Sequence, residues 1–285
     1  MTISRIERVA ALSRQSFRRD YLSPPRPVIM TAAVENWDGI RRLSPEQLLT
    51  AYHDCLIRVE VLEHGSGMDA AHWMSHVRLK HMTIEEYFRR TRSETNGGSL
   101  YAAQIPLRGS LSKLNKEIGK PPFNHFSNRL RRVTRQHPNL WVGPGGCVSS
   151  LHFDLVHNFN VQICGRKRFV LYDPRDMPYL YLPSDLELSW HSRVDIESPD
   201  LEKFPKFVKA TPLECMLEPG ETLFIPKGWP HATRSLEYCV NLNYWWPTMR
   251  DVVVHGPKQV LDRVLLRIRK LKRRMARASS GGGRD

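Results

Sequence analysis

Short β-type segments separated by turn residues fill the second half of this 285-residue chain. From residue 140 onward, apolar and β-branched runs alternate with turns such as Gly143-Pro144-Gly145-Gly146 and Pro226-Lys227-Gly228. Many short strands at this spacing are typical of an all-β sandwich or barrel, whereas βαβ units need a helix between successive strands. The pattern therefore predicts a mainly β fold. We expect its strands over 140–143, 147–152, 158–164, 167–172, 214–217, 221–225 and 237–246.

The first hundred residues have a mixed pattern, and we expect them to flank the β region. Ser44 followed by Pro45 is typical of a helix start, because serine caps the helix and proline suits its first position. We expect helices over 5–20, 45–53 and 83–88, and strands over 26–30 and 59–61.

After Pro257 the pattern becomes that of a basic amphipathic helix. Apolar residues recur at spacings of three and four and therefore share one helical stripe, with arginine and lysine on the other faces. The stripe consists of Leu261, Val264, Ile268, Leu271 and Met275. It can pack on its own barrel or pair with a second copy of the chain, and we expect a homodimer through this helix.

The net charge of +14 is concentrated in two places. Residues 255–285 contain ten lysines or arginines against two aspartates, and a second cluster lies just before residue 140. The second cluster consists of Arg129, Arg131, Arg132 and Arg135. Clustered positive charge attracts polyanions such as nucleic acid, and the alternative interpretation is a solvated face that keeps the protein soluble.

Composition excludes several classes of protein. No apolar run approaches the roughly 20 residues of a membrane helix, and the N-terminal sequence MTISRIERVAALSRQ lacks the apolar core of a signal peptide. The five cysteines are scattered and contain no CxxC, which argues against a disulfide scaffold and against a structural zinc site. We therefore expect a cytoplasmic protein with no membrane partner.

The strongest chemical pattern is Leu151-His152-Phe153-Asp154, which lies in the predicted β region. Residues i and i+2 of a strand point to the same side, so His152 and Asp154 are expected to face one interior. His231, at another predicted strand boundary, is the best candidate for a third ligand. Two histidines and one carboxylate form the facial triad that holds non-haem Fe(II) and leaves other positions open.

Lys167 begins the predicted strand 167–172. A lysine that points into a barrel is costly unless an anion meets it. A dicarboxylate cosubstrate that chelates the metal at one end and meets Lys167 at the other would supply this anion. Periodicity leaves open whether Lys167 points inward, or outward like its neighbours Arg166 and Arg168.

A series of short motifs surrounds these residues in a fixed order. The series includes Trp141-Val142-Gly143-Pro144-Gly145-Gly146, Asn158-Phe159, Gly165-Arg166-Lys167-Arg168, Tyr172-Asp173-Pro174, Ser198-Pro199-Asp200-Leu201, Glu218-Pro219-Gly220-Glu221, Leu223-Phe224-Ile225-Pro226, Trp229-Pro230-His231 and Asn243-Tyr244-Trp245. The series resembles the JmjC cupin-like hydroxylases, and within them the subgroup of the HIF asparaginyl hydroxylase and the tRNA wybutosine hydroxylase. The resemblance is dense over 140–246 and thinner before it.

The resemblance implies a double-stranded β-helix, or jelly roll, with flanking helices. It implies that Fe(II) is held by His152, Asp154 and His231, and that Lys167 pairs with the distal carboxylate of 2-oxoglutarate. Tyr101 matches the tyrosine that shares this carboxylate. Three further polar residues are implied near the cosubstrate, with ordinary strand hydrogen bonding as the alternative for the two amides: Asn158, Asn243 and Ser149. We expect His191 and Trp245 to have structural roles.

The reaction that the resemblance implies is hydroxylation of an unactivated C–H bond with O2 and 2-oxoglutarate, which yields succinate and CO2. We expect the substrate to be a protein or peptide side chain or a modified tRNA base, and demethylation is less expected because no reader module is recognisable. The alternative function is a non-catalytic cupin that binds nucleic acid through its basic surface. The expected domains are a catalytic domain over 1–250, the basic helix over 251–278 and a disordered tail over 279–285.

Overall fold

The computed structural model describes residues 4–62, 77–93, 100–125, 137–183 and 191–247. The expected C-terminal helix, the tail and the arginine cluster at 129–135 lie outside the described residues. The chain divides into two compact units, Met1–Trp246 and Pro247–Asp285, and the description below concerns the first unit. The homodimer therefore stays a prediction.

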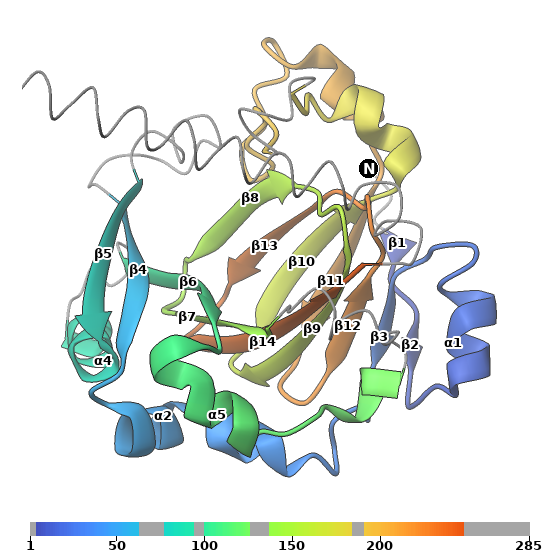
Figure 1. The fold of residues 1–285 in the computed structure, drawn as a ribbon. Helices are drawn as coiled ribbons and strands as arrows, with labels where there is room; N and C mark the ends of the chain where they lie inside the picture. Colours follow the sequence, from blue (N-terminus) through green and yellow to red (C-terminus); the bar gives the residue numbers. More distant parts are fainter. Residues whose placement is uncertain (1–3, 63–76, 94–99, 126–136, 184–190, 248–285) are drawn as a thin grey trace, which may run out of the picture. The chain divides into compact units, whose positions relative to one another are not determined.

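The described strands form two sheets (Figure 1). The smaller sheet has the order β1 (Ser4–Arg5), β11 (Pro212–Leu217), β10 (Lys167–Tyr172), β13 (His231–Ser235) and β8 (Val148–His152). The larger sheet has the order β2 (Arg8–Val9), β3 (Val28–Met30), β12 (Thr222–Ile225), β9 (His157–Cys164), β14 (Cys239–Trp246), β7 (Asn139–Gly143), β6 (Leu100–Pro106), β4 (Leu56–Leu62) and β5 (Val77–Thr83). Neighbouring strands are antiparallel, except that β1 runs parallel to β11 and β2 runs parallel to β3. The mainly β fold with a jelly-roll arrangement is thus confirmed.

Short helices flank the two sheets and connect the strands. The α-helices are α1 (Arg14–Asp20), α2 (Pro45–Tyr52), α4 (Ile84–Ser93) and α5 (Ser112–Glu117), and the 3₁₀ helices are η1 (Asp38–Leu43), η3 (Gly109–Leu111), η4 (Pro122–His125), η5 (Pro174–Tyr179) and η6 (Pro205–Lys209). The predicted cap of α2 is confirmed, because the Ser44 side chain accepts a hydrogen bond from Gln47 N at 3.3 Å. Among the described residues, no helix combines the length and the apolarity that a membrane crossing requires.

The predicted helix over 5–20 is wrong in its first half. Residues 4–9 instead form the edge strands β1 and β2, and the helix begins only at Arg14. Ser13 caps it, since its Oγ accepts a hydrogen bond from Ser16 N at 3.0 Å. Pairing with the edges of two sheets satisfies the backbone groups of residues 4–9 and overrides the local helical pattern.

The predicted strand ranges omit β13, but the strand boundary expected at His231 is confirmed, and the strand predicted over 237–246 begins at Cys239. The sequence of β13, HATRS, lacks the apolar alternation that marks a half-buried strand. Three of its five residues, His231, Thr233 and Ser235, pair with inward-facing positions of β10, so its inner face is polar. A strand that contributes polar groups to a site gives no hydrophobic signal.

The space between the sheets has an apolar half and a polar half. The apolar half is filled from both sheets, by a cluster that includes Phe169, Leu217, Leu223 and Ile225. The outer face of the larger sheet packs on the helices, through residues such as Phe159 of β9 and Phe17 of α1, whose rings lie 5.7 Å apart. The outer faces of both sheets are covered by apolar residues, and the polar side chains of the interior are concentrated in one half of the space between the sheets.

Candidate metal centre

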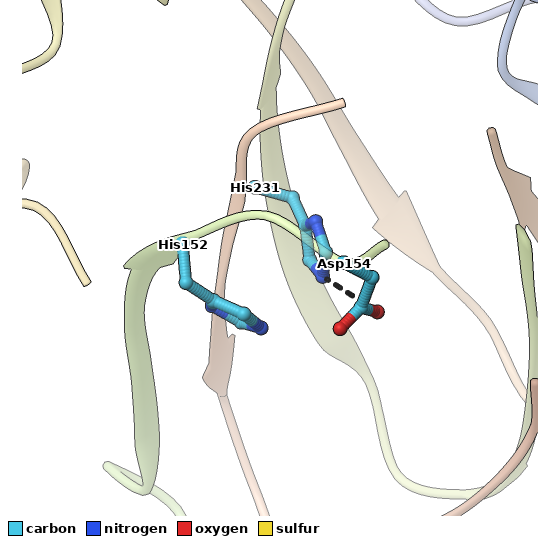
Figure 2. A group of neighbouring side chains, drawn as sticks. All are labelled: His152, Asp154 and His231. Atoms are coloured by element: carbon cyan, nitrogen blue, oxygen red, sulfur yellow. Dashed lines mark ion pairs between the residues drawn. The ribbon is translucent and has the colours of Figure 1, made fainter. Parts of the chain in front are cut away.

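Two histidines and one carboxylate meet in the polar half of the interior, and Figure 2 shows their side chains facing one another. His152 ends β8 and His231 begins β13, and the two residues are register partners in this antiparallel pair. Each of His152, Asp154 and His231 offers one ligand atom, and these atoms lie within 4.8 Å of one another. The distance from His231 Nε2 to Asp154 Oδ2 is 4.0 Å. Such a group of donors can hold a metal ion.

The hydrogen bonds of both imidazoles select the same ring nitrogen for the metal. His152 Nδ1 lies 2.7 Å from Ser150 O, and His231 Nδ1 lies 2.9 Å from Trp229 O. Because a carbonyl oxygen only accepts, each Nδ1 carries the proton and each Nε2 presents a lone pair. Burial, with a smaller contribution from His152, lowers the pKa of His231 and keeps its ring neutral. A neutral imidazole with a fixed tautomer is the form that binds a metal.

Asp154 faces the same interior as His152, as predicted, but not through strand alternation, because Asp154 does not lie on a strand. β8 ends at His152, and the loop that follows carries the carboxylate. The backbone carbonyl of Asp154 accepts a hydrogen bond from Gly228 N at 2.9 Å. Its Oδ2 accepts from Asn158 Nδ2 at 3.2 Å and from Trp245 Nε1 at 3.0 Å. Long-range contacts, rather than the strand, bring Asp154 to the histidines.

A one-residue bulge brings Ser149 to the same side of β8 as His152. Thr233 pairs with Ser149 and His231 pairs with His152, so two steps along β13 match three steps along β8. Residues three apart on a regular strand face opposite sides, and the extra residue removes this mismatch. Burial raises the pKa of the Tyr101 hydroxyl, and the nearby Ser149 side chain acts in the opposite direction.

Lys167 points into the interior, which settles the alternative that periodicity left open. The residue is 3% exposed, and its Nζ donates a hydrogen bond to Tyr101 OH at 3.1 Å. Nζ also lies 5.7 Å from the centre of the Trp141 ring. Burial lowers the pKa of Lys167 to about 8. Within the described ranges, no acidic side chain forms an ion pair with it.

Several buried polar atoms of the interior have no hydrogen-bond partner among the described residues. They are Asn158 Oδ1, Asn243 Oδ1, Thr233 Oγ1 and Trp141 Nε1. Unpaired buried polar groups cost about 1–3 kcal/mol each, so native proteins rarely retain them. Thr233 lies on β13 between His231 and Ser235, and Ser235 is the register partner of Lys167. The Thr233 hydroxyl and the Trp141 indole N–H can donate to a polar anionic ligand that extends from the metal cluster toward Lys167, whereas the two amide oxygens only accept and suit a donor group or a water.

Comparison with known protein families agrees with this geometry. Residues 14–251 match the cupin-like domain family. The chain belongs to this family. Its JmjC members depend in general on Fe(II) and 2-oxoglutarate, and this chain has a His-Asp-His cluster that could hold a metal, together with a buried lysine.

The curated relatives of this cupin-like chain carry names of two kinds. Lysine-specific demethylase 8 of Xenopus tropicalis is 33% identical over 235 residues, which are 82% of this chain and 51% of that protein. Lysine-specific demethylase JMJ30 of Arabidopsis thaliana is 30% identical over 248 residues, 86% of this chain and 56% of that protein. tRNA wybutosine-synthesizing protein 5 of Gallus gallus is 47% identical over 143 residues, 49% of this chain and 41% of that protein. The chain thus spans about half the length of these relatives.

Two residues to which the sequence analysis assigned structural roles lie beside the metal cluster. The His191 ring lies 5.0 Å from the His152 ring, and its Nδ1 is 2.7 Å from Ser150 Oγ. Burial lowers the pKa of His191 to about 3, so this second ring is also neutral. Trp245, expected in the core, instead donates to the Asp154 carboxylate. Neither residue belongs to a local spacing pattern that relates it to His152 or Asp154.

Proposed function

We propose that this cupin-like protein is an Fe(II)- and 2-oxoglutarate-dependent oxygenase that hydroxylates an unactivated C–H bond. In the balanced reaction, R–H, O2 and 2-oxoglutarate give R–OH, succinate and CO2. One oxygen atom of O2 enters the substrate and the other enters succinate. The oxidative decarboxylation that bound Fe(II) and 2-oxoglutarate supply provides the oxidant.

The observation that carries the proposal is the buried Lys167 facing the same interior as the metal cluster. A buried ammonium group without an anion is unfavourable, because burial disfavours the charged form. Its pKa of about 8 nevertheless leaves it mainly protonated at pH 7. The distal carboxylate of 2-oxoglutarate would compensate the charge, and the Tyr101 hydroxyl, 3.1 Å from Nζ, would be a second donor to it.

The remaining roles follow from the atoms that each residue presents. The Nε2 atoms of His152 and His231 and a carboxylate oxygen of Asp154 would hold one face of the metal, which leaves other positions for cosubstrate and O2. The side chains that line the interior toward Lys167 would orient the cosubstrate and exclude bulk water. We assign this positioning to Ser149, Asn158 and Asn243.

The test of the proposed reaction class needs no substrate. Fe(II) and then 2-oxoglutarate are added to the apoprotein without O2, and the visible metal-to-ligand charge-transfer band is recorded. The band is expected in the wild type, absent in His152→Ala, and formed only at far higher 2-oxoglutarate concentration in Lys167→Ala. Lys116→Ala, at an exposed position of α5, is the matched control for the loss of a lysine. A folded wild-type protein that gives no band would overturn the proposal.

For the substrate we propose a protein or peptide side chain, with a modified tRNA base as the second candidate. The demethylases cover more of this chain, whereas the tRNA wybutosine-synthesizing protein is more identical over a shorter part. Hydroxylation of an N-methyl group yields an unstable product that releases formaldehyde, so the same reaction would also demethylate. Succinate release is measured with unmodified peptides, N-methylated peptides and tRNA, and formaldehyde is measured in parallel.

RNA binding is tested separately from the reaction, through the dependence of RNA affinity on salt concentration. If the basic segments hold a tRNA, its affinity should fall steeply as salt concentration rises, because phosphate contacts release counterions. Succinate release with peptide alone, together with RNA binding that is absent or insensitive to salt, would remove the tRNA candidate.

A further inference from the structure

The three side chains of the metal cluster are not supported in the same way. His152 and His231 lie on paired strands of the smaller sheet, so the strand backbone fixes their positions. Asp154 follows the end of β8 and lacks this support. Its carboxylate is held from the larger sheet instead, because Trp245 Nε1 and Asn158 Nδ2 both donate to Oδ2, at 3.0 Å and 3.2 Å.

The two donors are themselves fixed as a pair. Trp245 on β14 and Asn158 on β9 are register partners, so their side chains lie on the same face of the larger sheet. β9 and β14 are adjacent strands with a partner on each outer side, β12 and β7. Because the amide nitrogen of Asn158 faces a carboxylate, which only accepts, the orientation of this amide is determined. Both donors are therefore preorganised before any ligand arrives.

Within the described ranges, no hydrogen bond reaches the other carboxylate oxygen of Asp154. Oδ2 lies 4.0 Å from His231 Nε2, but its two hydrogen bonds occupy its lone pairs and oppose rotation of the carboxylate, so the lone pairs of Oδ1 are the ones available to a metal. We propose that Trp245 and Asn158 form a clamp that restricts Asp154 to one-oxygen coordination of the metal, so that Trp245 is a positioning residue of the centre. The inference rests on the proposed function for the presence of a metal, but on no particular substrate.

Removal of one hydrogen-bond donor, Trp245 or Asn158, should weaken metal binding although Asp154 itself is kept as a metal ligand. Partners that orient a metal ligand typically contribute 10–100-fold to metal affinity. A carboxylate freed from the clamp can rotate and offer both oxygens, which changes the coordination number. Co(II) reports both effects, because its visible bands become more intense as the coordination number falls.

The experiment is a Co(II) titration of the apoprotein without cosubstrate or substrate, followed by visible absorption. Trp245→Phe removes the indole N–H and keeps an aromatic ring. Trp246→Phe is the matched control, because Trp246 is the next residue of β14 and its Nε1 has no hydrogen-bond partner in the part of the chain that the structure describes. We expect the Co(II) dissociation constant to rise about tenfold or more in Trp245→Phe, with altered band intensity, and to change less than about twofold in Trp246→Phe.

A second variant keeps the test valid if Trp245→Phe does not fold. Asn158→Ala removes the other donor without altering an aromatic ring, and circular dichroism and thermal unfolding report the folded state of each variant. Wild-type Co(II) affinity and band intensity in the folded donor variants would overturn the clamp. A wild-type protein that binds neither Co(II) nor Fe(II) would overturn the metal centre itself, so the two failures are distinguishable.

Discussion

Replacement of Lys167 by methionine should stabilise the ligand-free protein while it removes the proposed cosubstrate site. Burial lowers the pKa of Lys167 from 10.5 to about 8, so the folded protein holds this proton less tightly than the unfolded chain does. At about 1.4 kcal/mol per tenfold change, the buried charge costs the folded state about 3 kcal/mol at pH 7. Methionine is also unbranched but carries no charge, so Lys167→Met should raise the free energy of unfolding by about this amount.

The pH dependence distinguishes a buried charge from a simple packing effect. The unfolded chain binds more protons than the folded protein between pH 8 and pH 10.5, the two pKa values of Lys167, so wild-type stability rises across this window. The advantage of Lys167→Met should therefore shrink from about 3 kcal/mol at pH 7 to about 1 kcal/mol at pH 9.5. A packing effect would be the same at both pH values.

The assay is urea unfolding followed by tryptophan fluorescence at pH 7 and pH 9.5. Lys116→Met serves as the control, since Lys116 is exposed on α5 and its replacement removes no buried charge. Addition of a divalent metal and 2-oxoglutarate should stabilise the wild type and the control more than Lys167→Met, because the stabilisation by a ligand falls as the ligand binds more weakly. The reasoning is refuted if Lys167→Met is no more stable than the wild type at pH 7, or if its advantage is equal at both pH values.

Three further predictions concern the same interior and the turn beside it. Tyr101→Phe should weaken 2-oxoglutarate binding by about 2 kcal/mol, roughly 30-fold, because it removes a donor to a carboxylate. An anaerobic titration measures this affinity, and an unchanged value would show that the hydroxyl does not contact the cosubstrate. In the wild type, 2-oxoglutarate affinity should fall about tenfold per pH unit above about pH 8, as free Lys167 loses its proton, and should be independent of pH in Lys167→Met. Gly165→Ala should lower the free energy of unfolding by about 2 kcal/mol or more, because Gly165 has a φ of +68° and an added Cβ would overlap the Tyr238 carbonyl. Urea unfolding measures this change, and a variant as stable as the wild type would contradict the prediction.

The local patterns of the sequence were sufficient for most of the fold. Alternating apolar residues and Gly-Pro turns marked the strands between 139 and 225 to within two residues, because strand alternation depends only on neighbouring positions. The start of α2 was equally predictable, since Ser44 caps a helix through a residue three positions away. The three proposed ligands were also identifiable from residue type and spacing, and the structure brings them together.

What local patterns did not predict depends on contacts between segments far apart in the chain. Residues 4–9 form edge strands because two sheets offer them backbone partners, and β13 is a strand although its inner face is polar. The bulge that turns Ser149 toward the site becomes visible only in the register of β8 against β13.

The site shows the same division between residue type and tertiary placement. Residue spacing nominated Asp154, but its position beside the histidines results from donors on β9 and β14, not from strand alternation. Lys167 could be identified as a candidate, and only its burial between two sheets established that it points inward. Residue types and spacings are carried by the chain itself, whereas register and sheet-to-sheet contacts exist only once distant segments have packed together.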